Sequence, residues 1–166
     1  MIEFNTERLI AKSDVQIVNS ELITANSNNA VIDLLKLERT TGRESGFVFY
    51  DKNKTDIKIC HIGFLRKRGK FELSFGTEIE YRRMGYMYEA LVNTIDWLFK
   101  HTNENIIWAI PGNYASEKLL KKCGFKKSTS EQINEFKWYA LTKDDTKSAN
   151  NGGPQHGKKG KQPNGC

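Results

Sequence analysis

The chain has 166 residues, a length that suits one domain with a buried core and is too short for two ordinary domains. Hydrophobic residues make up 38% of it and charged residues 28%, and no stretch approaches the roughly 20 apolar residues of a membrane span, so we expect no membrane-spanning segment. The net charge of +6 suits a polyanionic ligand, but a lysine-rich surface gives the same value, so charge alone selects no function.

The cysteines and histidines do not form the pattern of a disulfide framework or a metal site. Cys60, Cys123 and Cys166 are odd in number and far apart, and the three histidines lack the spacing of metal ligands. We therefore expect free thiols and no metal. Residues 1–10 contain no apolar run behind a basic start and no cleavage site, which predicts a protein without a signal peptide, located in the cytosol.

Residues 144–166 differ in composition from the rest of the chain. They are rich in Gly, Asn, Lys and Pro and hold no large apolar side chain. Such a segment cannot offset the entropy lost on ordering, so it is predicted to be a disordered tail, with a folded domain over residues 1–143. A weak basic contact of this tail with nucleic acid is the lesser alternative to simple solvation.

The first half of the domain changes from helical to strand periodicity. Residues 8–12 read as a short strand, and residues 15–39 carry helical spacing in two pieces. Residues 46–50, 57–64 and 71–79 then alternate between apolar and polar side chains, with turn-rich stretches between them. This pattern predicts an antiparallel meander.

The second half begins with a helix after Gly85. Its apolar residues recur at steps of three and four and form one stripe: Tyr88, Leu91, Val92, Ile95, Leu98 and Phe99. The almost wholly apolar run 106–110 then predicts a strand buried on both faces, which Pro111 ends. A strand–helix–strand unit results.

A second helix is predicted over residues 114–123. Asn113 is a suitable N-cap, and Gly124 suits the left-handed position past the end of the helix. A final strand covers residues 135–141. This order of elements predicts an α/β (α+β) fold, with a mixed, mostly antiparallel sheet and helices on both faces.

Residues 80–87 form the most informative segment, because they join the third meander strand to the helix after Gly85. A helix N-terminus offers unpaired backbone N–H groups and partial positive charge, and a glycine there lets a ligand approach closely. The GxxxxGK[ST] and GxGxxG patterns are absent, which disfavours the nucleotide folds that carry them. The alternative is that Gly85 only makes a turn and that Arg82 and Arg83 are solvated.

Four short blocks carry a resemblance to a known family. Arg82 and Gly85, with Met87 imperfectly, match a phosphate loop of the form Q/R-x-x-G-x-G/A, inside the string YRRMGYMYEAL. Residues 113–125, NYASEKLLKKCGF, form the second block, and TERLI at 6–10 and HIGF at 61–64 are the others. On these blocks the chain resembles the GNAT acetyltransferases, in their RimJ/RimL-like branch, from about residue 5 to residue 127.

The resemblance implies a GNAT fold, with a sheet of about six to seven strands, and acetyl-CoA as cosubstrate. The backbone amides that would hold its pyrophosphate are those of Arg82, Arg83, Met84, Gly85, Tyr86 and Met87. The pantetheine arm would lie along Phe75, Thr77 and Ile79, in a splay between this strand and residues 106–110. Asn113 and Ser116 would contact the arm near the thioester.

Acetyl transfer to an amine needs orientation, a proton acceptor, an oxyanion donor and a proton for the leaving thiolate. The resemblance points to a backbone N–H within 75–77 as the oxyanion donor. We take Glu72 as the candidate base and Glu78 as the second, although either can be a surface carboxylate. Many relatives place a tyrosine acid where this chain has Leu120, so the acid would be Ser116, Tyr114 or a water.

Three functions remain open at this stage. The first is an enzyme acetylating a primary amine, either a protein N-terminus or a small amine. The second is a non-catalytic acyl-CoA-binding regulatory domain, which Met87 and Leu120 favour slightly. The third, ranked last, is a nucleic-acid binder using the tail and the basic residues Arg66, Lys67, Arg68 and Lys70. That run lacks interleaved aromatic residues, and we expect no specific nucleic acid partner. The sequence does not identify the acceptor or decide between a monomer and a homodimer.

Overall fold

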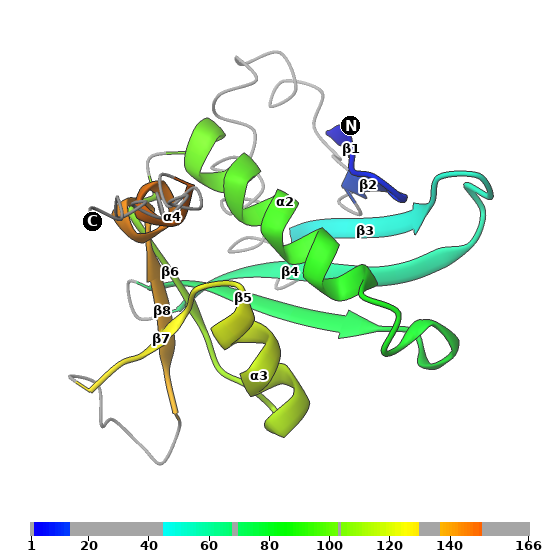
Figure 1. Cartoon of the computed structure of the whole chain (residues 1–166). Helices are drawn as coiled ribbons and strands as arrows, with labels where there is room; N and C mark the ends of the chain where they lie inside the picture. Colours follow the sequence, from blue (N-terminus) through cyan, green and yellow to red (C-terminus); the bar gives the residue numbers. More distant parts are fainter. Residues whose placement is uncertain (1, 14–44, 68–69, 103, 130–136, 151–166) are drawn as a thin grey trace, which may run out of the picture.

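The computed structural model describes residues 2–13, 45–67, 70–102, 104–129 and 137–150 (Figure 1). In chain order the elements are β1 (Glu3–Asn5), β2 (Leu9–Ser13), β3 (Ser45–Asp51), β4 (Lys58–Lys67), β5 (Lys70–Thr77), the short 3-10 helix η3 (Ile79–Tyr81), α2 (Tyr86–His101), β6 (Ile106–Ala109), α3 (Tyr114–Lys122), β7 (Lys126–Lys127), β8 (Tyr139–Thr142) and α4 (Lys143–Asn150).

All eight described strands belong to one mixed sheet, in the order β1-β2-β3-β4-β5-β6-β8-β7. The strands from β1 to β5 pair antiparallel, as the meander predicts. Among the described strands only β5 and β6 are parallel, because α2 connects them and returns the chain to the starting edge. Figure 1 shows α2 lying across the sheet, over β3 and β4. The predicted fold class is confirmed.

The core lies between α2 and the sheet face that it covers. Alternation places one face of each strand inward, so that Phe47, Phe64 and Leu73 are almost fully buried. Phe4 and Trp97 pack on Phe47 with ring centroids 5.0 and 5.2 Å away. Truncating such a buried aromatic ring costs about 3–5 kcal/mol, so this packing fixes where β5 and α2 lie.

Helix α2 buries a wider set of residues than its stripe of large side chains predicted. The buried ones are Met87, Ala90, Leu91, Thr94, Ile95, Leu98 and Phe99. Val92 and Tyr88 were also expected in this set, but Val92 is 40% exposed and Tyr88 is half-buried. Small residues such as Ala90 let the helix approach the sheet closely. A pattern based on large hydrophobic side chains alone does not predict that they are buried.

The third meander strand is shorter than predicted. β5 ends at Thr77, and Ile79, which was expected to continue the strand, lies in η3 with 77% of its surface exposed. The backbone N–H of Tyr81 donates to the carbonyl of Glu78, 3.0 Å away, and this bond turns the chain toward α2. The alternating pattern continues past the point where the chain turns.

The segment after Lys143 begins as a helix, whereas the composition predicted disorder from residue 144. The hydroxyl of Thr142 caps the start of helix α4 by accepting from the N–H of Asp145 at 3.2 Å. The carboxylate of Asp145 accepts from Thr142 in return and forms an ion pair with Lys126 at 2.6 Å. These contacts join the segment to the sheet, and composition does not reveal them. The division into a domain and a tail itself stays a prediction.

The remaining differences concern short elements and the edges of the described ranges. Strands of three and two residues, β1 and β7, are too short to show a period and were missed. The final strand, predicted over 135–141, is β8. The helical prediction for 15–39, like residues 135–136, lies outside the described residues. Among the described helices none has the length and apolar composition needed to cross a membrane.

Candidate functional site

The loop between β5 and α2, residues 78–85, is held at both ends by its own backbone and by the strand that it leaves. The N–H of Glu78 donates to the carbonyl of Ile59 at 3.0 Å and extends the β4–β5 pairing by one bond. The Nε of Arg82 then donates back to the carbonyl of Thr77 at 3.2 Å. The loop therefore folds over the end of β5.

Two residues of this loop have positive φ, Arg83 at 63° and Gly85 at 81°. The left-handed conformation costs a non-glycine residue roughly 1–2 kcal/mol, so the surrounding contacts must hold Arg83 in place. Gly85 is the N-cap of α2 and makes no side-chain cap bond, because glycine has no side chain. The first amides of α2 therefore have no side-chain cap, which is the geometry that an anion site at residues 80–87 would need, and that site stays a prediction.

The parallel pair β5–β6 is short. The two strands are in register only at Glu72 with Trp108 and at Leu73 with Ala109. Beyond them β5 runs on to the β5–α2 loop, while β6 leads to α3 (Figure 1). The strands diverge here, and Phe75 and Thr77 lie on the part of β5 beyond this pairing. We call the space between the diverging strands β5 and β6 the splay.

Large apolar side chains are exposed around the splay. Ile79 and Met84 on the loop are 77% and 55% exposed, and Tyr114 at the start of α3 is 74% exposed. Single exposed apolar residues are ordinary, and each of these three lies in the segment that follows the end of β5 or of β6.

Asn113 and Ser116 form a capping box at the start of α3, as the N-cap prediction required. The side chain of Asn113 accepts from the N–H of Ser116 at 2.9 Å, and the Oγ of Ser116 accepts from the N–H of Asn113 at 3.0 Å. The hydroxyl proton of Ser116 is donated to the carbonyl of Asn113 at 2.8 Å. In this arrangement the hydroxyl proton of Ser116 is engaged in the helix cap and is not free to protonate a leaving thiolate.

The two candidate bases lie at opposite ends of β5. Glu72 is half-buried at the point where β5 pairs with Trp108 of β6. Glu78 lies beyond Thr77 and forms an ion pair with Lys58 at 3.1 Å. Six residues of extended chain correspond to about 20 Å, so the two carboxylates cannot serve the same reacting atom.

The sheet face away from α2, here called the outer face, carries Glu72 together with a histidine that the sequence did not single out. His61 of β4 lies directly opposite Gly76 of β5. Its imidazole occupies the space that a Cβ at Gly76 would take, with Cε1 only 2.7 Å from that position. His61 is exposed, so an ionisable ring lies beside the splay.

Two tryptophans and a lysine extend this outer face. Trp108 and Trp138 meet edge to face at 6.1 Å, and the Nζ of Lys70 lies 4.8 Å above the ring of Trp108. Both indoles are half-buried, which agrees with their expected role as core or pocket wall. Lys70 is therefore engaged with aromatic rings and is not simply part of a solvated basic run.

Tyr139, Glu117 and Lys121 form a second polar group below α3. The hydroxyl of Tyr139 donates to Glu117 at 2.7 Å, and Lys121 pairs with the same oxygen at 2.7 Å. The hydrogen bonds from Lys121 and Tyr139 lower the pKa of Glu117 to about 2, and the bond to Glu117 raises the pKa of Tyr139. This group ties β8 to α3.

The described cysteines are unsuited to nucleophilic chemistry. Burial raises the pKa of both Cys60 and Cys123 to about 12, which keeps each as a neutral thiol. In the described ranges, no group of three His, Cys, Asp or Glu side chains comes together in a way that could hold a metal ion.

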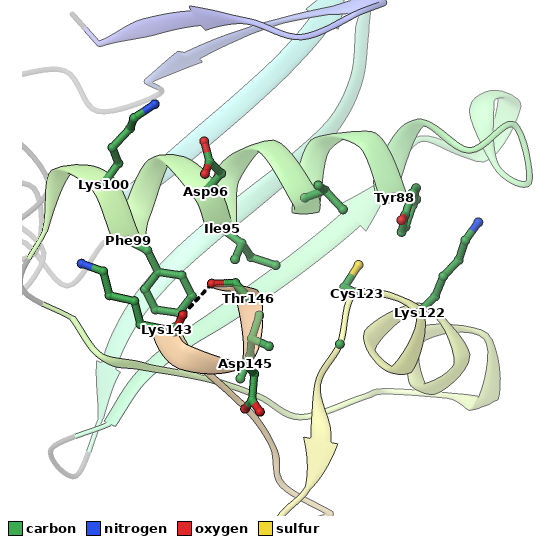
Figure 2. A pocket seen from close by; sticks show the side chains of 13 residues that line it. Tyr88, Ile95, Asp96, Phe99, Lys100, Lys122, Cys123, Lys143, Asp145 and Thr146 are labelled. Carbon is green, nitrogen blue, oxygen red and sulfur yellow. Dashed lines mark hydrogen bonds between the residues drawn. The ribbon is translucent and has the colours of Figure 1, made fainter. Parts of the chain in front are cut away.

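A cavity of about 480 Å³ lies between α2, the end of α3, β8 and α4. Cys123 and Ile95 line it, and Figure 2 shows the Cys123 sulfur turned toward α2. At one side the Nζ of Lys122 lies 4.1 Å above the ring of Tyr88. Its described lining includes no residue of β5 or of the β5–α2 loop, so the cavity is separate from the splay.

Comparison with known proteins decides the family of the chain. Residues 6–126 match the model of the acetyltransferase (GNAT) domain. The chain belongs to the GNAT acetyltransferases. It is accordingly an N-acetyltransferase, and this family uses acetyl-CoA. No curated protein sequence matches the chain.

Solved structures similar to this acetyltransferase share its fold at low sequence identity. A ribosomal-protein-S5-alanine acetyltransferase from Vibrio fischeri is 22% identical, with a TM-score of 0.59, over 87% of this chain and 98% of that chain. An acetyltransferase from Agrobacterium tumefaciens is 16% identical, with a TM-score of 0.63, over 85% and 94%. A spermidine N-acetyltransferase from Vibrio cholerae, solved with CoA and spermine, is 16% identical, with a TM-score of 0.56, over 83% and 97%.

The structure brings some of the predicted site residues of this acetyltransferase together and separates others. Phe75 and Thr77 lie on β5 beyond its pairing with β6, residues 82–87 form the loop end and the start of α2, and Asn113 and Ser116 cap α3 together. Ile79 is exposed in η3, and Glu78 lies apart from Glu72. Sequence reasoning gave no role to His61, although histidine is the side chain that most often titrates near neutral pH. It also gave none to Arg8, which the TERLI block contains and which contacts the loop.

Proposed function

We propose that the protein binds acetyl-CoA in the splay between β5 and β6 and transfers the acetyl group to a primary amine. The observation that carries this proposal is the end of β5–β6 pairing at Leu73 and Ala109, next to a glycine-capped helix N-terminus. An extended arm can then add to the open side of β5 while its anionic end lies at the first amides of α2.

The residues present fit such a ligand. The loop amides from Arg82 to Met87 lie at the N-terminus of a 16-residue helix, and Gly85 leaves the backbone accessible. Met87, which departs from the family pattern, is 92% buried and turned into the core, so its side chain does not occupy the loop's outer side. Phe75 and Thr77 supply the strand edge and the wall for the arm.

In the proposed reaction the amine nitrogen forms a bond to the acyl carbon while the carbon–sulfur bond breaks. Glu72 takes the amine proton, directly or through a water, and a backbone N–H within 75–77 donates to the developing oxyanion. The thiolate takes a proton from solvent or from an acid on the chain. No residue of the chain is acylated, so no nucleophilic cysteine is needed.

The role of Glu78 and Ser116 is weaker in this proposal than that of Glu72. Glu78 is paired with Lys58 and lies about 20 Å from Glu72 along the strand. The hydroxyl proton of Ser116 is donated within the capping box. A water or Tyr114, which is exposed beside the splay, is the better source of the thiolate proton.

The acceptor class follows from the chemistry that the site permits. A primary amine, whether a protein N-terminus or a small amine, attacks from the outer face, where Glu72 lies. The acceptors in the names of the similar structures, a ribosomal protein and spermidine, are both amines of this class. A location in the cytosol belongs to the same proposal and is supported by the free thiols of Cys60 and Cys123.

A second candidate function is a non-catalytic acyl-CoA-binding domain. Leu120, which stands where many relatives carry a tyrosine acid, is fully buried, and Ser116 is committed to the helix cap. These two observations favour a domain that holds the ligand without turnover.

The test is a calorimetric titration with acetyl-CoA, followed by thiol release with N-terminal peptides, polyamines and small amines. Binding with amine-dependent thiol release supports the enzyme and identifies its acceptor class. Binding without release from any amine would favour the regulatory domain. Absence of binding would overturn both proposals.

A further inference from the structure

We propose that Arg8 is a positioning residue for the β5–α2 loop, and that acetyl-CoA affinity therefore depends on the N-terminal turn between β1 and β2. This inference rests on the proposed function of the loop. It assigns a role to a residue that lies outside both the loop and the strands of the splay.

One guanidinium contacts three parts of the loop and helix at once. The Nε of Arg8 pairs with Oε2 of Glu89 at 2.7 Å, and its Nη1 donates to the carbonyl of Met84 at 3.0 Å. Its Cζ lies 4.2 Å from the centroid of the Tyr86 ring. These partners lie immediately before, at and after the start of α2.

The contact with Met84 bears directly on anion binding. A loop that binds an anion through its N–H groups must turn its carbonyls elsewhere, and the Met84 carbonyl lies between the two positive-φ residues, Arg83 and Gly85. Arg8 fixes that carbonyl by donating to it.

Glu89 anchors Arg8 through the backbone as well as the side chain. Its Oε1 accepts from the N–H of Arg8 at 2.7 Å and from the hydroxyl of Thr6. Burial opposes ionisation of Glu89, but the hydrogen bonds from Thr6 and Arg8 outweigh it and lower the pKa of this carboxyl. The carboxylate is 11% exposed and stays charged in the first turn of α2.

Because Glu89 is charged, a positioning role and a simple charge effect predict opposite changes in acetyl-CoA affinity when it is removed. A carboxylate beside an anion site repels the anion, so electrostatics alone predicts that removing the charge of Glu89 strengthens acetyl-CoA binding. If Glu89 instead holds Arg8 in place, removing it weakens binding. The Arg8–Glu89 pair thus separates a positioning role from a simple charge effect.

The experiment measures acetyl-CoA affinity by calorimetry for Arg8→Gln, Arg8→Lys and Glu89→Gln. We expect each to weaken affinity about tenfold, the effect of losing a charge-assisted hydrogen bond, with unchanged KM for the amine. Arg8→Lys keeps the positive charge, but one ammonium cannot bond to Glu89 and to the Met84 carbonyl in the same geometry. It should therefore not restore the acetyl-CoA affinity. Lys52→Gln is the matched control, because its ammonium contacts the carbonyl of Thr6 in the same turn and not the loop.

Equal affinity in Arg8→Lys and the unaltered protein, or tighter binding by Glu89→Gln, would overturn the positioning role. If Arg8→Gln does not fold, as judged by thermal melting, Arg8→Lys and Glu89→Gln carry the test. Failure of the unaltered protein to bind acetyl-CoA would instead overturn the proposed function, and this inference with it.

Discussion

The two ends of β5 are built in different ways. At its C-terminal end, bonds from Arg82 and Arg8 and a glycine cap fix a backbone arrangement. At its N-terminal end, Glu72 lies on an outer face with Trp108 beside it, and its chemistry depends on a side chain. In the proposed function, ligand binding therefore depends on backbone geometry, whereas proton transfer depends on the side chain of Glu72.

The largest expected effect separates the two carboxylates of β5. Glu72→Gln should lower kcat for thiol release about a hundredfold, because it removes the proton acceptor, while acetyl-CoA affinity stays unchanged. Glu78→Gln, the matched variant at the other end, should change kcat by less than about threefold, because an exposed ion pair contributes little. Steady-state kinetics and calorimetry on both variants provide the measurement, and the reverse order of effects would rule out Glu72 as the base.

The next effect tests the loop end. Gly85→Val places a branched side chain at a φ of 81°, with its Cβ 3.5 Å from Nη2 of Arg8. The side chain would block close approach of a ligand to the loop backbone, so acetyl-CoA binding should weaken about tenfold. In Gly112→Ala, the control, the added Cβ meets no atom within 4 Å, so affinity should not change. Equal calorimetric affinities for the two variants would contradict an anion site at Gly85.

A smaller effect concerns Ser116. Because its hydroxyl completes the capping box, Ser116→Ala should lower the free energy of unfolding by about 1 kcal/mol and leave kcat within about twofold. Ser116→Thr keeps the hydroxyl and should restore most of the stability. Denaturant unfolding and thiol release measure the two quantities, and a large loss of kcat with normal stability would make Ser116 the acid.

The smallest effect is a pH dependence away from the splay. The folded-state pKa of Glu117 is about 2, below the ordinary 4.5, so its ionised form stabilises the fold above pH 4.5 and this contribution is lost as pH falls toward 2. Glu117→Gln should therefore be less stable than the unaltered protein at pH 7, and the gap should narrow below pH 4.5. Thermal melting across this range tests it, and a gap independent of pH would contradict the assignment.

Much of this fold was visible in the sequence because its signals are local. The alternation in 46–50 and 57–64 predicts β3 and β4, and Asn113 and Gly124 bracket α3 as expected, with Gly124 at a φ of 92°. Such local signals fail at Ile79, where the alternation of apolar and polar residues continues although the strand has ended. They also fail in α4, where contacts with the sheet order a segment whose composition predicts disorder.

The candidate site was predicted unevenly for the same reason. Residues 82–87 were recognised because a glycine before an amphipathic helix is a feature of adjacent positions. Arg8 and His61 were not assigned, because their partners at Glu89 and Gly76 are distant in sequence. No periodicity or short motif relates residues that far apart.

The sequence by itself therefore determined the order of most elements, the helix start at Gly85 and the family resemblance, since each depends on neighbouring residues. Only the tertiary structure decided that β5 and β6 separate after Leu73 and Ala109, that Glu78 pairs with Lys58, and that Arg8 reaches the Met84 carbonyl. These features depend on which strands become neighbours and on where the chain turns. Packing of the whole core against α2 fixes both.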